Sequence, residues 1–185
     1  MGDPLITPAP GFDQPIAVLK HCHDRIRKQL ATLERLQAHL QQQGQTVEAK
    51  QAATAILRYF NQSAPNHHAD EEEDLLPMLD ATAAGDDAKV LSSLKPQILD
   101  EHQQMEAQWE SLDRQLQAIA AGTGSALSED DVRRFAALYA GHMEKEEGTI
   151  APMAKRLFSD DQMATLGNAM RIRRGIPEEA GDVDR

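Results

Sequence analysis

A segment of eleven residues occurs twice in this 185-residue chain, at residues 67–77 (HHADEEEDLLP) and 142–152 (HMEKEEGTIAP). Both copies have His at the first position, Glu-Glu at the fifth and sixth, an aliphatic residue at the ninth and Pro at the eleventh. Residues four apart lie on the same face of an α-helix, so each copy presents one imidazole and one carboxylate from neighbouring turns. Two such units that face each other can hold two metal ions with two bridging carboxylates.

The repeat extends beyond these segments, which makes a chance explanation poor. A single His-x-x-x-Glu pair is usually an exposed helical pair without function. Here, the same offset of 75 residues also relates Phe60 to Phe135. A second offset of 79 residues relates His23 to His102, each on an apolar stripe at helical spacing. Alone, a His on such a stripe is more often a core residue bonded to a backbone carbonyl.

Apolar residues at three- and four-residue steps predict four long helices and a short fifth one. We expect them over residues 13–44, 47–81, 89–121, 128–157 and 159–173, with Asp13, Ser128 and Ser159 as N-caps. Pro65 should kink or restart the second helix, and Pro96 could break the third. The predicted fold is an all-α, up-down-up-down four-helix bundle with internal two-fold pseudosymmetry and an appended C-terminal helix.

The ends of the chain are predicted to lie outside this bundle domain, which we place at residues 13–175. Residues 1–12 hold three prolines and read as an extended arm. Residues 176–185 read as a disordered tail. Arg171, Arg173 and Arg174 close the fifth helix, where the simplest interpretation is that they complement its dipole.

Charge and composition favour a cytoplasmic protein. The net charge of −11 disfavours a nucleic-acid or anionic-membrane partner. Cys22 is the sole cysteine, so no internal disulfide can form and a reducing compartment is expected. We see neither a signal peptide nor an apolar run approaching the ~20 residues that cross a bilayer.

Four imidazoles and two carboxylates are predicted to point into the bundle. They are His23, His67, Glu71, His102, His142 and Glu146. Buried carboxylates require a compensating charge, which two metal ions would supply. Structural zinc favours closed four-ligand sites, magnesium and calcium favour oxygen, and mixed His and carboxylate ligation suits iron or manganese. With both Glu residues bridging and an oxo or hydroxo bridge, each ion keeps an open position for dioxygen, nitric oxide or peroxide.

Neighbouring polar residues are predicted to have other roles. Glu72, Glu73, Glu144 and Glu147 are expected to be solvated or to bond the ligands. His68 is a weaker ligand candidate than His67, because Met143 occupies the matching position of the second copy. For Tyr59 and Tyr139 we favour packing, although either could donate a hydrogen bond to the site. Cys22 points about 100° away from His23 on the helix.

Residues 14 to about 157 resemble the hemerythrin-like (HHE cation-binding) domains. The resemblance rests on residues 22–26 (CHDRI), 100–102 (DEH) and the two repeated segments. It implies a non-haem di-iron centre in a four-helix bundle, with the same six residues as ligands. Oxygen-carrying hemerythrins have a further His one turn before the residue equivalent to His102, where this chain has Ile98. The set of four His and two Glu is more similar to the branch that includes iron–sulfur-cluster repair proteins, but these usually carry an N-terminal cysteine-bearing domain.

The leading functional hypothesis is a di-iron protein that binds or responds to dioxygen, nitric oxide or peroxide, in oxidative or nitrosative stress. Manganese or zinc would suit the ligand set less well. One alternative is a di-iron peroxidase or nitric oxide reductase. Others are iron storage, iron donation to iron–sulfur repair, and an interaction module in which the metal only holds the bundle together.

Overall fold

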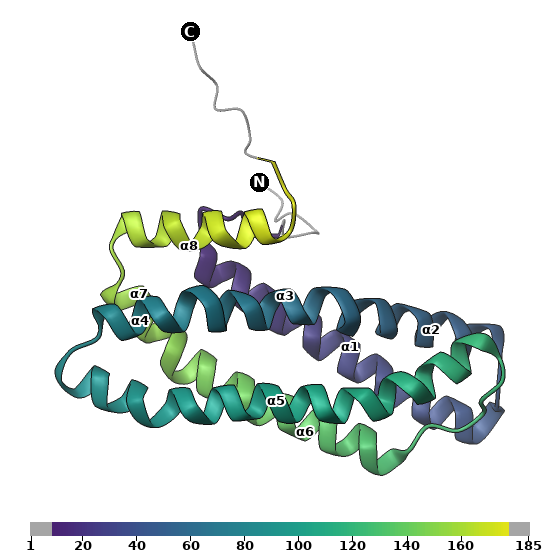
Figure 1. Cartoon of the computed structure of the whole chain (residues 1–185). Helices are drawn as coiled ribbons and strands as arrows, with labels where there is room; N and C mark the ends of the chain where they lie inside the picture. The colour runs from purple at the N-terminus through teal and green to yellow at the C-terminus, as the bar shows by residue number, and fades with distance from the viewer. Residues whose placement is uncertain (1–8, 178–185) are drawn as a thin grey trace, which may run out of the picture.

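The protein forms a bundle of four long helical rods with a fifth helix outside it (Figure 1). The structure is a computed structural model that describes residues 9–177. Its elements are α1 (Pro15–Gln43), α2 (Val47–Arg58), η1 (Tyr59–Ser63), α3 (Ala64–Ala69), η2 (Asp70–Leu75), α4 (Leu76–Thr82), α5 (Gly85–Ala121), α6 (Glu129–Lys145), η3 (Glu146–Ile150), α7 (Ala151–Leu157) and α8 (Asp160–Arg173). Within the described residues all regular structure is helical, which confirms the predicted fold class.

The second and fourth rods are continuous helices with π-helical turns inserted. Elements α2 to α4 form one rod, and α6, η3 and α7 form another. Pro65, Pro77 and Pro152 each lie in the first turn of the α-helix that follows a π segment. A proline there lacks an N–H and disrupts the regular α-helical bonding of the preceding turn, and a π turn is one way to absorb that disruption. Regular α-helix resumes at Ala64, directly after the π turn of η1 and one residue before Pro65. Such a restart is one of the two outcomes predicted for this proline.

Two of the three predicted N-caps are present, and one predicted N-cap and one possible helix break are not. Ser128 accepts a hydrogen bond from the backbone of Asp131, and Ser159 forms a capping box with Gln162, both as predicted. The prediction that Asp13 caps α1 is wrong, because Gln14 occupies that position and makes no side-chain cap bond. The possible break at Pro96 is also absent, since α5 runs through this exposed proline.

The apolar core is divided into two clusters that lie on either side of a buried polar layer. One cluster includes Leu33, Ile56, Phe60, Leu112 and Phe135. The other includes Leu19, Leu76, Ile98, Met153 and Leu166, the last from α8. Each fully buried side chain of this size contributes roughly 1.5–3 kcal/mol through the hydrophobic effect. The two clusters thus hold the rods rigidly at both ends of the polar layer.

Helix α8 packs against the start of α1 through a close backbone contact. A Cβ atom on Gly167 would lie 1.8 Å from the carbonyl oxygen of Phe12, so only glycine allows this approach. Arg174 lies over the ring of Phe12, 5.8 Å from its centroid. The predicted disordered tail falls mainly on residues 178–185, which lie outside the described residues.

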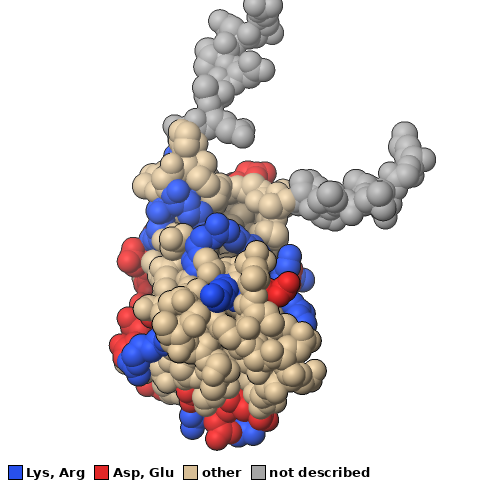
Figure 2. All heavy atoms as spheres, turned by 90° about the vertical axis from the view of Figure 1, so that its right-hand side faces the viewer, with Lys and Arg blue, Asp and Glu red and all other residues tan. Residues whose placement is uncertain are grey.

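The surface carries both signs of charge. On the face drawn in Figure 2, basic and acidic side chains form scattered groups among other residues. That face therefore has no uniform charge. Within residues 9–177, no helix combines the length and the apolar character that crossing a bilayer requires.

Candidate metal centre

The six predicted ligands meet in the polar layer, and all are buried. They come from all four rods: His23 from α1, His67 and Glu71 from α3 and η2, His102 from α5, and His142 and Glu146 from α6 and η3. They form two groups, in each of which one donor atom per residue lies within 4.8 Å of the others. The groups are His23, His67, Glu71 and Glu146, and then Glu71, His102, His142 and Glu146. Both carboxylates belong to both groups, which is the arrangement that two bridging ligands require.

Ring nitrogens and carboxylate oxygens converge at short distances. Nε2 of His142 lies 3.1 Å from Oε1 of Glu146, and Nε2 of His23 lies 3.1 Å from Oε2 of the same carboxylate. On the other carboxylate, Nε2 of His67 is 3.3 Å from Oε1 of Glu71, and Nε2 of His102 is 3.3 Å from Oε2. The imidazoles therefore alternate around two carboxylates at the centre of the bundle.

Three carboxylates behind the imidazoles fix which nitrogen faces the centre. Nδ1 of His102 donates to Glu72 (2.6 Å), and Nδ1 of His23 donates to Glu147 (2.9 Å). Nδ1 of His142 likewise bonds Glu101 at 3.0 Å. With the proton on Nδ1, each Nε2 turns a lone pair inward, as metal-binding histidines do.

Two of these inward nitrogens lie unusually close together. Nε2 of His102 and Nε2 of His142 are 3.1 Å apart. If both are acceptors, their lone pairs repel unless a cation lies nearby. Both ring nitrogens of His67 and Oε2 of Glu71 are buried and have no hydrogen-bond partner among residues 9–177. Because unpaired buried polar atoms are costly, the donor set fits metal ions in the centre.

The pKa shifts of the two carboxylates also indicate that the centre suits metal ions. Burial and repulsion from Glu146 raise the pKa of Glu71 well above its ordinary value. Burial alone would raise the pKa of Glu146 too, but the adjacent imidazoles of His142 and His23 outweigh it and hold this pKa well below the ordinary value. Burial and the neighbouring His23 lower the pKa of His67, which keeps that imidazole neutral. The centre thus needs a proton or a metal ion to balance its second carboxylate.

The π-helical turns occur at both predicted bridging positions. Glu71 is the second residue of η2, and Glu146 is the first residue of η3. π turns change the direction of side chains locally and occur often at functional sites. The sequence analysis did not predict these turns, although the prolines that follow them were a signal.

Helix α8 is tied to the first repeated segment by ion pairs around Asp70, which is completely buried. Arg173 and Arg174 each donate to this carboxylate at 2.6 Å. Arg173 also bonds Asp74 at 2.7 Å. The interpretation of these two arginines as dipole partners is therefore incomplete: Arg173 lies in the last turn of α8 as predicted, but both arginines also brace the turn that carries Glu71. Sequence reasoning missed the partnership because 103 residues separate Asp70 from Arg173.

The other candidates lie around the centre and belong to neither donor group. The ring of His68 stacks on that of His102, with centroids 4.0 Å apart. Tyr59 donates to the backbone oxygen of Cys22 (3.3 Å), and burial raises the pKa of the buried Tyr139. Cys22 is a partly buried free thiol, and burial raises its pKa. Glu72 and Glu147, predicted to be solvated or to bond the ligands, do the latter.

Glu101 is a residue of the centre that the sequence analysis did not single out. It bonds both His142 and Lys145. The offset that relates His102 to His23 relates Glu101 to Cys22, so the repeat contained no second copy to draw attention to it.

Comparison with known proteins places this centre in a family. The chain is similar to an uncharacterized protein of Haemophilus influenzae, 27% identical over 167 residues that cover 90% of this chain and 94% of that one. Residues 14–154 match the model of the hemerythrin HHE cation binding domain. This span contains all six residues of the two donor groups and all four rods except the last three residues of α7. The chain therefore belongs to the hemerythrin HHE cation-binding family.

Proposed function

We propose that the protein is a non-haem di-iron protein. His23 and His67 would hold one ion, His102 and His142 the other, and both carboxylates would bridge. The observation that carries the proposal is the sharing of Glu71 and Glu146 by two four-residue donor groups. Mixed nitrogen and oxygen donors suit iron, with manganese as the nearest competitor, whereas zinc favours a closed four-ligand site.

The proposed ligand set leaves room for a small ligand. Each group supplies two imidazoles and two carboxylates, which is fewer donors than the six that iron commonly takes. Ile98, one turn before His102, is fully buried and supplies no further nitrogen. Bound iron would exchange electrons with a ligand such as dioxygen, nitric oxide or peroxide. We therefore place the protein in the response to oxidative or nitrosative stress, and the lone free thiol of Cys22 supports a cytoplasmic site of action.

The proposal is tested by the reaction of the reduced, iron-loaded protein with dioxygen. Stopped-flow absorbance should show rapid oxidation that deoxygenation does not reverse. Ile98→His adds an imidazole on the same helix face as His102 and should slow the oxidation at least about tenfold. Ile98→Leu is the matched control, because it alters packing without adding a nitrogen. A long-lived adduct that deoxygenation reverses would indicate an oxygen carrier instead, and no spectral response to dioxygen, nitric oxide or peroxide would refute the proposal.

A further inference from the structure

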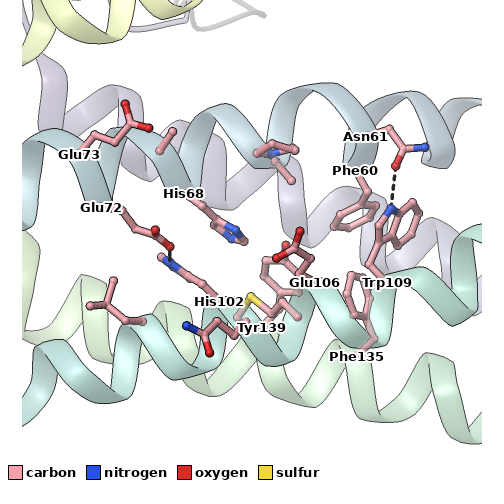
Figure 3. A pocket seen from close by; sticks show the side chains of 16 residues that line it. Phe60, Asn61, His68, Glu72, Glu73, His102, Glu106, Trp109, Phe135 and Tyr139 are labelled. Atoms are coloured by element: carbon pink, nitrogen blue, oxygen red, sulfur yellow. Dashed lines mark hydrogen bonds and ion pairs between the residues drawn. The ribbon is translucent and has the colours of Figure 1, made fainter.

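A pocket of about 670 Å³ lies against one side of the proposed metal centre (Figure 3). This volume is far larger than a diatomic molecule needs and falls within the range that holds small organic ligands. The pocket lies between the second and third rods, with His68 and Glu72 on one side and His102 and Glu106 on the other. Its place beside His102 makes it a site for a second molecule rather than for the small ligand alone.

One wall of the pocket is aromatic. The rings of Phe60 and Trp109 lie 4.8 Å apart, and that of Phe135 lies 5.1 Å from Phe60. Tyr139 continues the wall, 5.0 Å from Phe135 and 6.0 Å from His68. Trp109 is the partly exposed ring of this wall, and Phe60, Phe135 and Tyr139 are almost completely buried behind it, so another aromatic ring would pack chiefly on Trp109. This wall favours a ligand with an aromatic body.

The inner end of the pocket carries a polar group without a partner. His68 projects into the pocket from α3, stacked on His102 (Figure 3). Its Nε2 is buried and has no hydrogen-bond partner in the part of the chain that the structure describes. Leaving such an atom unpaired costs about 1–3 kcal/mol, which a ligand hydroxyl would recover. A hydroxyl can donate or accept, so it suits either tautomer of the ring.

The charges around the pocket select against anions. Glu72, Glu73 and Glu106 line it, and no lysine or arginine of residues 9–177 does, although Arg173 outside the pocket pairs with Glu73. A carboxylate or phosphate ligand would meet like charge without a counter-ion. A cation could reach the exposed rim but would gain little at the inner end, where Glu72 already accepts from Nδ1 of His102. An uncharged molecule meets no unfavourable charge at either the rim or the inner end of the pocket.

We propose that this pocket binds a small, uncharged phenol, with its ring on the aromatic wall and its hydroxyl on Nε2 of His68. The inference deepens the proposed function, because it names the class of organic molecule that lies next to the His102 side of the centre. It concerns binding alone and rests on protein side chains. It therefore stands or fails separately from the identity of the metal.

Trp109 provides the measurement, since it is the sole tryptophan and lines the pocket. The full-length chain without added metal would be titrated with para-ethylphenol while its fluorescence is recorded. Ethylbenzene tests the hydroxyl, and the same phenol with a carboxylate or an amine on its ethyl arm tests the charge. We expect para-ethylphenol to bind at least about tenfold more tightly than ethylbenzene and than the carboxylate derivative. Equal affinities, tightest binding by the amine derivative or no response at all would overturn the proposal.

Substitutions locate the site. His68→Leu should weaken para-ethylphenol about tenfold and leave ethylbenzene unchanged, because it removes only the hydrogen bond. Ala69→Phe fills the pocket and should weaken both. His21→Leu, remote from the pocket, is the matched control and should alter neither. If His68→Leu binds para-ethylphenol as the wild type does, the hydroxyl does not reach this ring and the proposal is wrong.

Discussion

The two copies of the repeated segment place the same donors at the centre but support them differently. In the second copy, His142 donates to Glu101, and Lys145 pairs with the same carboxylate. In the first copy, Nδ1 of His67 has no hydrogen-bond partner within the described residues. The position equivalent to Lys145 is Asp70, which binds Arg173, the last residue of α8, and Arg174 directly after it. The inward-facing groups are thus duplicated, and so are Glu72 and Glu147 behind His102 and His23. Only the groups behind His67 and His142 differ between the two copies.

This difference predicts two unequal metal positions. A carboxylate behind a histidine orients the ring and strengthens it as a donor. His102 and His142 both have such a partner, in Glu72 and Glu101. Of the other pair, His23 has one and His67 has none. We expect the ion between His102 and His142 to bind more tightly than its neighbour.

The largest effect should come from the feature that the copies share. Glu71→Ala or Glu146→Ala removes a carboxylate common to both donor groups. The bound iron should fall to one ion per chain or none, and the melting temperature should fall with it, because metal binding stabilises the folded state. Elemental analysis and thermal unfolding measure both. Glu73→Ala, in the same segment but outside both groups, is the control; unchanged iron in Glu146→Ala would show that this residue is not a ligand.

A smaller effect tests how the first copy is braced. Asp70→Asn leaves Arg173 and Arg174 without their buried counter-charge and should lower the free energy of unfolding by about 3–5 kcal/mol. Lys145→Met, the equivalent site of the second copy, should cost less than about 1 kcal/mol, because Lys145 is partly exposed. Urea denaturation of the two variants gives the comparison. Equal losses would mean that α8 contributes no special support.

The third prediction concerns the groups behind the imidazoles. Glu101→Gln weakens the hydrogen bond to His142 and should lower iron affinity at that position about 10- to 100-fold. Cys22→Ser alters the equivalent position of the other half, where no such bond exists, and should leave affinity unchanged. Competition with a chelator measures both variants. If Cys22→Ser loses as much iron affinity as Glu101→Gln, the prediction that the two metal positions differ in affinity is wrong.

The smallest effect is a pH dependence of the metal-free protein. Burial and the neighbouring His102 hold the pKa of His68 well below its ordinary 6.5. The unfolded chain therefore binds a proton at this residue below about pH 6.5 that the folded chain does not, so stability falls as pH drops from there. His68→Gln should remove this contribution, at most about 1.4 kcal/mol per pH unit. Urea unfolding of the wild type and of His68→Gln at pH 7.5 and pH 5.5 measures this contribution. An equal pH dependence of stability in the two proteins would contradict the prediction. Met143, at the equivalent position, does not titrate.

The helices and the convergence of the six residues were predictable because their signals are local or repeated. Apolar periodicity located the rods, and the matched offsets brought His23 and His102 into the same layer as the repeated segments. Glu101 was not predictable in this way, because Cys22 occupies the equivalent position. The pairing of Asp70 with α8 depends on tertiary packing between distant segments. The pocket depends on how four aromatic rings from three helical rods come together in space, which the periodicity of the sequence does not determine.

The central claim is that two metal ions share both carboxylates. Iron content of the purified chain, combined with anomalous scattering from its crystals, tests it most directly. We predict two iron ions per chain, one near His23 and His67 and the other near His102 and His142, with Glu71 and Glu146 contacting both. A single ion bound by half of the set, or an ion bound by His68 with His67 unbound, would contradict it.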